Sequence, residues 1–171
     1  MSIQKDISLS ALSLLERIIA NTAAESDVLG IVRKRLLSKV VVNLGSTELT
    51  IRKISHKCVL EYVRKFRDME TVLSTYLKTG MQQADNPHLQ LKTINSLHSI
   101  LIAEQRLFTY SLPSALPLVQ ELIDAACQQE YTDVRRAALI CLIFALKVKG
   151  AAEQISLLPL KSQQQLNELQ K

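Results

Sequence analysis

The sequence predicts an all-α protein, a solenoid of stacked helix pairs, and three observations support this fold class. Apolar residues make up 47% of the 171 residues and are mostly Leu, Ile and Ala. Glycine and proline number only four each and aromatic residues reach only 4%, which argues against β-sandwiches and β-barrels. The third observation is a helix-start pattern that returns along the chain.

This recurring pattern is a short polar turn, then an apolar and a basic residue that open an apolar-periodic helix. It occurs at Ile51–Ile54, Leu91–Ile94 and Val134–Ala137, about 40 residues apart. Because that period is typical of HEAT repeats, we expect an armadillo-like HEAT-repeat solenoid. Solenoids of this kind seldom perform chemistry and bind partners through their turns or their concave face.

In the N-terminal third we expect helices over residues 6–24, 27–44 and from Thr47 or Thr50 to residue 66. Leu, Ile and Val return there at steps of three and four residues. Asp6 and Asp27 are suited to cap the first two helices, because a carboxylate accepts from unpaired backbone N–H groups. Gly45 follows the second helix, where glycine is common.

In the middle of the chain we expect helices over residues 68–81 and 87–107. Asp68 is a good N-terminal residue for the first of them. Pro87 is well placed at the start of the second, because proline is tolerated in a first helical turn. Residues 84–88 then form the turn between the two helices.

In the C-terminal third we expect helices over residues 114–126, 134–148 and 162–171. Ser114 is the expected N-cap of the first, with Pro117 in its first turn. Residues 130–133 form the next turn. Gly150 stops the following helix, and a linker that contains Pro159 leads to the short last one.

These elements predict about three and a half helix pairs followed by a C-terminal cap helix. The helix that begins near Asp6 resembles the second half of a repeat whose first half is missing. No linker is long enough to separate two domains, so residues 1–171 are expected to form one domain. The expected core between the layers contains Leu36, Val40, Ile54, Val59, Leu73, Leu77, Ile94, Leu97, Leu101, Leu122, Ala138, Leu142 and Ala145.

Positive charge is concentrated in one part of the chain. The formal net charge is +5, and ten Lys and Arg residues lie between Arg33 and Arg67, with only Glu48 and Glu61 against them. Such asymmetry predicts a partner with an acidic surface: tubulin, another acidic protein, nucleic acid or anionic lipid. The alternative is a solvated helix face whose charges only keep the protein soluble.

Catalysis and membrane insertion are not expected. His56, His88 and His98 form no metal-binding pair, and no nucleotide-binding or nucleophile motif is present. We therefore expect no enzyme activity, cofactor, metal or small-molecule substrate. No apolar run approaches the roughly 20 residues that span a bilayer, and no signal peptide is evident. The three cysteines, Cys58, Cys127 and Cys141, read as buried free thiols of a cytoplasmic protein.

The turns are the expected binding surface, because turns within successive repeats lie along one edge of such a stack. The candidate partner-binding residues are Ser46, Thr47, Arg52, Lys53, Asn86, His88, Lys92, Thr132, Arg135 and Arg136. Two interpretations stay open for Arg52 and Arg135, namely partner binding or pairing with an Asp of a neighbouring repeat. Lys53 and Arg136 lie one step round the helix and are expected to be available.

Two turns and the tail resemble a known family. Val41–Ser46 followed by Thr50–Lys53, and Tyr131–Ala138, are similar to the turns of TOG domains. Residues 148–150, 155–158 and 161–169 resemble the ending of TOG domains of the CLASP and crescerin type. The chain departs from that family in having about three and a half repeats in place of six, and in having no tryptophan.

The resemblance implies a HEAT-repeat paddle whose turns bind αβ-tubulin and which helps regulate microtubule dynamics. It also implies a cytoskeletal location, at a cilium or centrosome among the possibilities. The alternative is a HEAT or armadillo-like scaffold with a non-tubulin protein partner. Weak nucleic-acid binding through the basic stretch is the third hypothesis, which the shortage of aromatic residues for base stacking disfavours.

Overall fold

The structure is a computed structural model, and it describes residues 3–23, 30–83, 85–127 and 130–169. Helices and turns account for these ranges, with no β-strand in them. The prediction of an all-α protein is therefore confirmed. The expected break at residues 24–27 lies outside the described residues.

Two of the helical runs contain a π-helical turn. Val32–Leu36 (η1) leads into α3, and Tyr76–Met81 (η2) extends α5. The remaining helices are α1 (Ile3–Asn21), α3 (Leu37–Asn43), α4 (Leu49–Phe66), α5 (Met69–Thr75), α6 (Pro87–Ala103), α7 (Gln105–Tyr110), α8 (Leu112–Cys127), α9 (Thr132–Leu146), α10 (Ala151–Ile155) and α11 (Leu160–Leu169).

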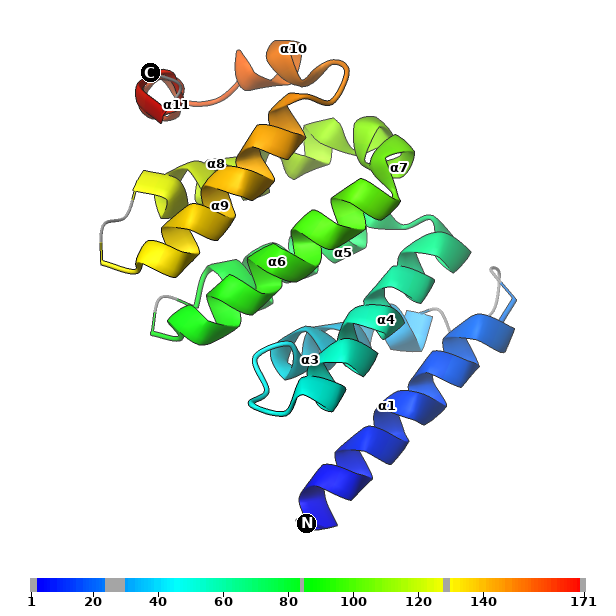
Figure 1. The fold of residues 1–171 in the computed structure, drawn as a ribbon. Coiled ribbons are helices and arrows are strands. Elements are labelled where there is room, and N and C mark those ends of the chain that lie inside the picture. The colour runs from blue at the N-terminus through cyan, green and yellow to red at the C-terminus, as the bar shows by residue number, and fades with distance from the viewer. Residues whose placement is uncertain (1–2, 24–29, 84, 128–129, 170–171) are drawn as a thin grey trace.

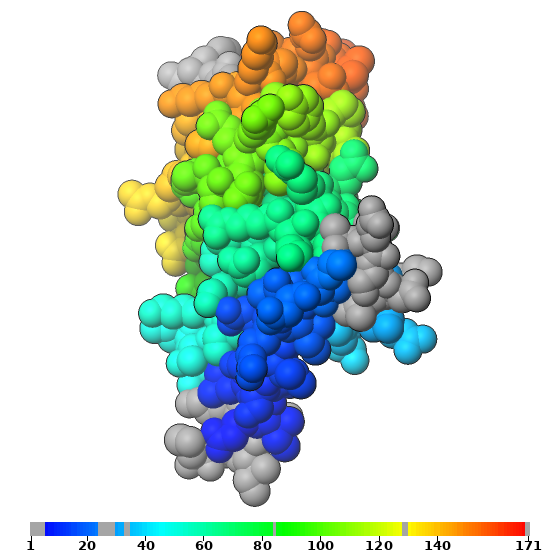
Figure 2. Space-filling view, turned by 90° about the vertical axis from the view of Figure 1, so that its right-hand side faces the viewer, coloured from blue at the N-terminus to red at the C-terminus, as the bar shows by residue number. Residues whose placement is uncertain are grey.

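The helices form two layers. In Figure 1, α1, α4, α6 and α9 lie side by side in one layer, and α3, α5 and α8 lie behind α4, α6 and α9. Packing follows the chain order, because α3 contacts α4, η2 contacts α6, and α8 contacts α9. Figure 2 shows the result as an elongated body, with α1 at one end and the C-terminal elements at the other. Helices α10 and α11 pack on α8 at that second end.

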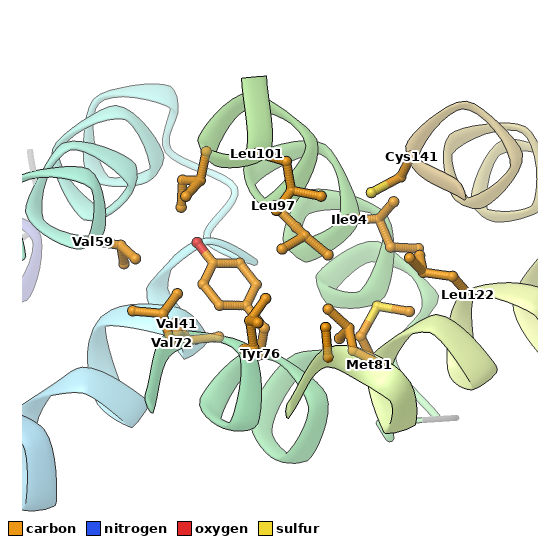
Figure 3. Packing of buried hydrophobic residues seen from close by; sticks show 14 of the residues in the cluster. Val41, Val59, Val72, Tyr76, Met81, Ile94, Leu97, Leu101, Leu122 and Cys141 are labelled. Carbon is orange, nitrogen blue, oxygen red and sulfur yellow. The ribbon is translucent and has the colours of Figure 1, made fainter. Parts of the chain in front are cut away.

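A continuous apolar core lies between the layers. Figure 3 shows Tyr76, Leu97 and Val59 reaching toward one another from η2, α6 and α4. Most of the predicted core residues are buried, while Leu36 and Ile54 are partly buried and pack against the core, as Leu77 does. The layers are therefore joined as the apolar periodicity predicts.

Close backbone approach explains two glycines. A Cβ atom at Gly80 would lie 2.4 Å from Thr93 Cγ2, so only glycine lets η2 pack this closely on α6. A Cβ atom at Gly45 would lie 3.0 Å from Leu89 Cδ1, because the α3–α4 turn packs closely against the start of α6. Gly45 therefore serves packing between neighbouring turns.

Several N-terminal boundaries follow their capping residues. Asp68 accepts a hydrogen bond from the Thr71 N–H at 3.3 Å and begins α5, as predicted. Asn86 caps α6, with Pro87 at the first helical position. The expected cap at Asp6 is wrong, since α1 begins at Ile3 and Asp6 lies in its first turn. An acidic side chain is still favourable there because it faces the positive end of the helix dipole.

The C-terminal half differs from prediction in more places. The helix over 87–107 ends at Ala103, and α7 follows after a break at Glu104, where the backbone has φ −126° and ψ 40°. The Glu104 carboxylate accepts a hydrogen bond from Arg64 Nε at 2.8 Å, so a contact with α4 accompanies a break that no glycine or proline marks. Ser114 is not an N-cap, because α8 already begins at Leu112 and includes Pro117.

The last helices are shifted or added. α9 ends at Leu146, slightly before the predicted Val148, and Gly150 adopts the left-handed conformation with φ 85°. That glycine begins α10, a short helix that the sequence did not predict. The final helix covers Leu160–Leu169, close to the predicted range of 162–171.

Candidate functional site

The second helices of the pairs all begin on the same edge of the stack. In Figure 1 the first residues of α4, α6 and α9 lie along the left-hand edge, together with the turns that lead into them. We call this surface the turn edge and define it as residues 44–53, 85–92 and 130–136. All of the predicted binding residues belong to it.

The first turn is held together by Arg52. Its Nη1 donates to the carbonyl oxygens of Ser46 at 2.7 Å and Thr47 at 2.8 Å. The Ser46 hydroxyl in turn accepts from the Glu48 N–H at 3.2 Å. Arg52 therefore stabilises its own turn, which is a structural role different from pairing with an Asp of a neighbouring repeat, one of the two interpretations that the sequence left open.

Basic side chains gather in a hollow between α4 and α6. The hollow has a volume of about 400 Å³ and is lined by Arg52, Lys53 and Lys92 over an apolar floor of Leu44 and Leu49. Lys53 is exposed and Lys92 is partly exposed. The structure thus brings three of the predicted residues together from two helices, α4 and α6.

A hydrogen-bond chain leads from the lining of this hollow into the core. His56 Nδ1 is 2.7 Å from Ser96 Oγ, and Tyr76 Oη is 2.7 Å from the same oxygen. Burial lowers the pKa of His56, so the imidazole is held in its neutral form. Burial also raises the pKa of Tyr76.

Sequence reasoning did not assign His56 and Ser96 to the site. His56 lies three residues after Lys53, and Ser96 lies four residues after Lys92. Helical spacing therefore places each on the same face as its basic neighbour, and this spacing could have identified both. Asn95 also lines the hollow.

The second hollow, between α6 and α9, has a different charge. Its volume is about 380 Å³, and His88 and Thr132 line it together with Glu130 and Asp133. Asn86 does not line it, and its side-chain oxygen instead accepts from the Leu89 N–H at 3.0 Å. The turn edge is therefore not uniformly basic, because carboxylates lie at its centre.

The third hollow lies between α8, α9 and α11 and is the largest, at about 770 Å³. Arg135 and Arg136 line it, with Arg136 exposed and Arg135 partly buried. Gln165 also lines it, and its Oε1 is buried with no hydrogen-bond partner among the described residues. A second basic region thus lies at the far end of the turn edge.

Two basic residues of α4 that lie away from the turn edge are paired. Lys57 Nζ lies 2.7 Å from Glu16, and Arg64 Nε lies 2.8 Å from Glu104. In contrast, the side chains of Lys53, Lys92 and Arg136 have no ion pair or hydrogen bond within the described ranges. The turn edge therefore carries three cations that are available to a partner, although exposed cations such as Arg106 and Lys147 also lie elsewhere.

The cysteines are reduced. Cys58 and Cys141 are buried, as expected, whereas Cys127 is only partly buried because it lines the third hollow. Burial raises the pKa of Cys58 and Cys141 to about 12, so neither is a thiolate at neutral pH.

Two further classes of site are absent from the described residues. Among them, no group of three or more His, Cys, Asp or Glu side chains could hold a metal ion. None of the described helices combines the length and the apolar character that crossing a membrane requires. The hollows of the turn edge are therefore the strongest candidates for a functional surface.

Comparisons with known proteins do not assign this geometry to a family. The chain matches no protein-family model, and searches of curated proteins and solved structures found no similar one. The functional inference therefore depends on the geometry and charge of the turn edge.

Proposed function

We propose that this protein is a HEAT-repeat, TOG-like module that binds αβ-tubulin through its turn edge and helps regulate microtubule dynamics. The single observation that carries the proposal is the placement of Lys53, Lys92 and Arg136. These side chains lie on the edge where the turns meet, and they have no partner among the described residues. The proposal places the protein at the cytoskeleton, in the cytoplasm or at a cilium or centrosome.

Electrostatics supports an acidic protein as the partner. Exposed cations steer an acidic surface toward them and fix its orientation more than they add affinity. The two basic hollows are separated by the carboxylates of Glu130 and Asp133, so a fitting partner carries two acidic clusters with a gap between them. Tubulin has strongly acidic surfaces, which suits this arrangement.

A HEAT-like scaffold that binds a different acidic protein is the second candidate. The observation that favours it is the first hollow, where Asn95, Ser96 and Ser99 stand beside Lys53 and Lys92. Such a groove suits the carboxylates and backbone of an extended acidic peptide. The lack of a tryptophan on the turns also separates this chain from the TOG family pattern.

Size-exclusion chromatography with unpolymerised αβ-tubulin tests the proposal. We expect the protein to co-elute with tubulin at low salt and to co-elute less at moderate salt, because salt screens exposed charges. If the protein elutes separately even at low salt, the tubulin proposal fails and the scaffold proposal takes its place.

A further inference from the structure

Helix α1 has two apolar faces, and only one of them packs against α4 among the described residues. Leu12, Leu15 and Ile19 are buried in the interface with α4. Ile7 and Leu14 belong to the second face, and both are among the most exposed large apolar residues, at 63% and 57%.

The second face has the spacing of a helix-packing surface. Ile7, Ala11, Leu14 and Ile18 recur at steps of four, three and four residues, which aligns them along one side of a helix. Single exposed apolar residues are ordinary, but an aligned row on one helix marks an interaction surface. Ile18 is exposed at 38%, so the row is open over its full length.

This row forms one wall of an apolar groove. Leu36 and Val40, with Lys39 and Asn43, form the other wall, and the groove between α1 and the η1–α3 segment has a volume of about 420 Å³. Figure 2 shows that α1 is the last helix at this end of the stack. No helix occupies the groove among the described residues.

The layers of the stack indicate the shape of the occupant. Elsewhere each helix of the α1–α4–α6–α9 layer packs against a helix of the second layer, as α4 does with α3 and α9 does with α8. The groove lies next to α3, where the apolar interface between the two layers would accept one more helix. Its shape is therefore matched by one amphipathic helix that lies against α1 and α3.

Charge indicates the chemistry of the occupant. Lys39 lines the groove, and Arg35, one turn earlier, is exposed. Arg17 is exposed on α1 next to Ile18. We propose that this groove docks an amphipathic helix of another protein, with apolar residues at matching steps and acidic residues along its flank. A second copy of this chain fits less well, because its own cations and its net charge of +5 would repel.

The test uses a designed fluorescein-labelled peptide about as long as α1, with leucines at steps of four, three and four and glutamates on the flank. We expect saturable binding by fluorescence anisotropy, and Leu14→Glu should weaken it by about tenfold or more. Leu157→Glu is the matched control, because Leu157 is similarly exposed at 66% and lies at the other end of the stack, and it should leave binding unchanged. Should Leu14→Glu disturb folding, Ile7→Glu provides the same test.

A charge exchange separates specific docking from apolar adhesion. We expect a peptide with lysines in place of the glutamates to bind about tenfold more weakly than the glutamate peptide. Lys39→Glu should reduce this difference in affinity between the two peptides. Equal binding of the two peptides, absence of saturable binding, or insensitivity to Leu14→Glu would each overturn the proposal. A wild-type dimer in sedimentation that Leu14→Glu dissociates would assign the groove to a second copy instead.

Discussion

Gly80 and Thr93 occupy adjoining positions in η2 and α6 where no space is left for another carbon atom. Replacing Gly80 with Ala would place a Cβ atom 2.4 Å from both Cγ2 and Oγ1 of Thr93. We expect Gly80→Ala to lower the free energy of unfolding by about 1–3 kcal/mol, as overpacking of a close interface does. Urea denaturation measures this change.

The matched control for that substitution is Gly30→Ala. A Cβ atom at Gly30 would meet nothing within 4 Å, so the same added methyl group has room there. We expect stability to be unchanged or slightly increased, since alanine restricts the unfolded chain. An equal loss of stability in Gly80→Ala and Gly30→Ala would show that steric overlap with Thr93 does not cause the destabilisation.

His56 links stability to pH through its contact with Ser96. Because burial lowers the pKa of His56 below 6.5, the unfolded chain takes up a proton at a pH where the folded protein does not. The contribution of His56 to stability is therefore complete above pH 6.5 and is lost as the pH falls toward the folded-state pKa. We expect the free energy of unfolding to decrease over this range.

The variant His56→Asn tests this dependence, because the Asn side chain can reach Ser96 but does not titrate. Urea denaturation between about pH 7.5 and about pH 5 should show a weaker pH dependence in the variant than in the wild type. An identical slope in both proteins would contradict the assignment to His56.

At the scale of the elements, the first turn depends on Arg52. Arg52→Ala removes two hydrogen bonds to the carbonyl groups of Ser46 and Thr47. Because the guanidinium is partly exposed, we expect a loss of only about 1 kcal/mol, together with greater amide hydrogen exchange in residues 44–48. Exchange that is unchanged in this turn would show that Arg52 is dispensable for its shape.

Helix starts could be predicted from the sequence because capping is local chemistry. Asp68, and Asn86 with Pro87, each mark a helix start through a hydrogen bond or a backbone conformation that involves only nearby residues. The break at Glu104 could not be predicted, since the Arg64 that contacts it lies 40 residues earlier in the chain. Local patterns do not report such tertiary contacts.

The same division holds for the candidate site. Lys53, Lys92 and Arg136 lie near the starts of α4, α6 and α9, where the recurring helix-start pattern of the sequence predicts them. The hydrogen bonds of Arg52 to the carbonyl groups of its own turn depend on the conformation of that turn. The hydrogen-bond chain from His56 through Ser96 to Tyr76 depends on the contact of α4, α6 and η2. These contacts are long-range in sequence and needed the structure.

At the scale of the whole molecule, one core joins all the helix pairs. Leu97 is fully buried near the centre of that core, beside Ile94 and Tyr76 in Figure 3. We expect Leu97→Ala to cost about 2–5 kcal/mol of stability, as truncations in well-packed cores do. Leu157→Ala, at a residue that is 66% exposed, is the control in the same denaturation experiment. A loss below about 1 kcal/mol at Leu97 would contradict a continuous core.

The binding surface also extends over the whole molecule, because its two basic regions lie at opposite ends of the turn edge. Single exposed charge pairs contribute only about 0.2–1 kcal/mol, so one alanine substitution need not abolish binding. A pair of charge reversals adds repulsion at both ends. Lys53 and Arg136 are exposed, and the fold should survive their replacement.

The most direct measurement is the affinity for αβ-tubulin of the wild type and of the Lys53→Glu, Arg136→Glu double variant. We expect the double variant to bind at least about tenfold more weakly, mainly through slower association, and to depend less on salt. The control pair, Arg106→Glu with Lys147→Glu, changes the net charge equally at exposed positions away from the turn edge and should bind like the wild type. Equal affinity of the wild type and the Lys53→Glu, Arg136→Glu variant, or an equal loss in both pairs, would contradict binding through the turn edge.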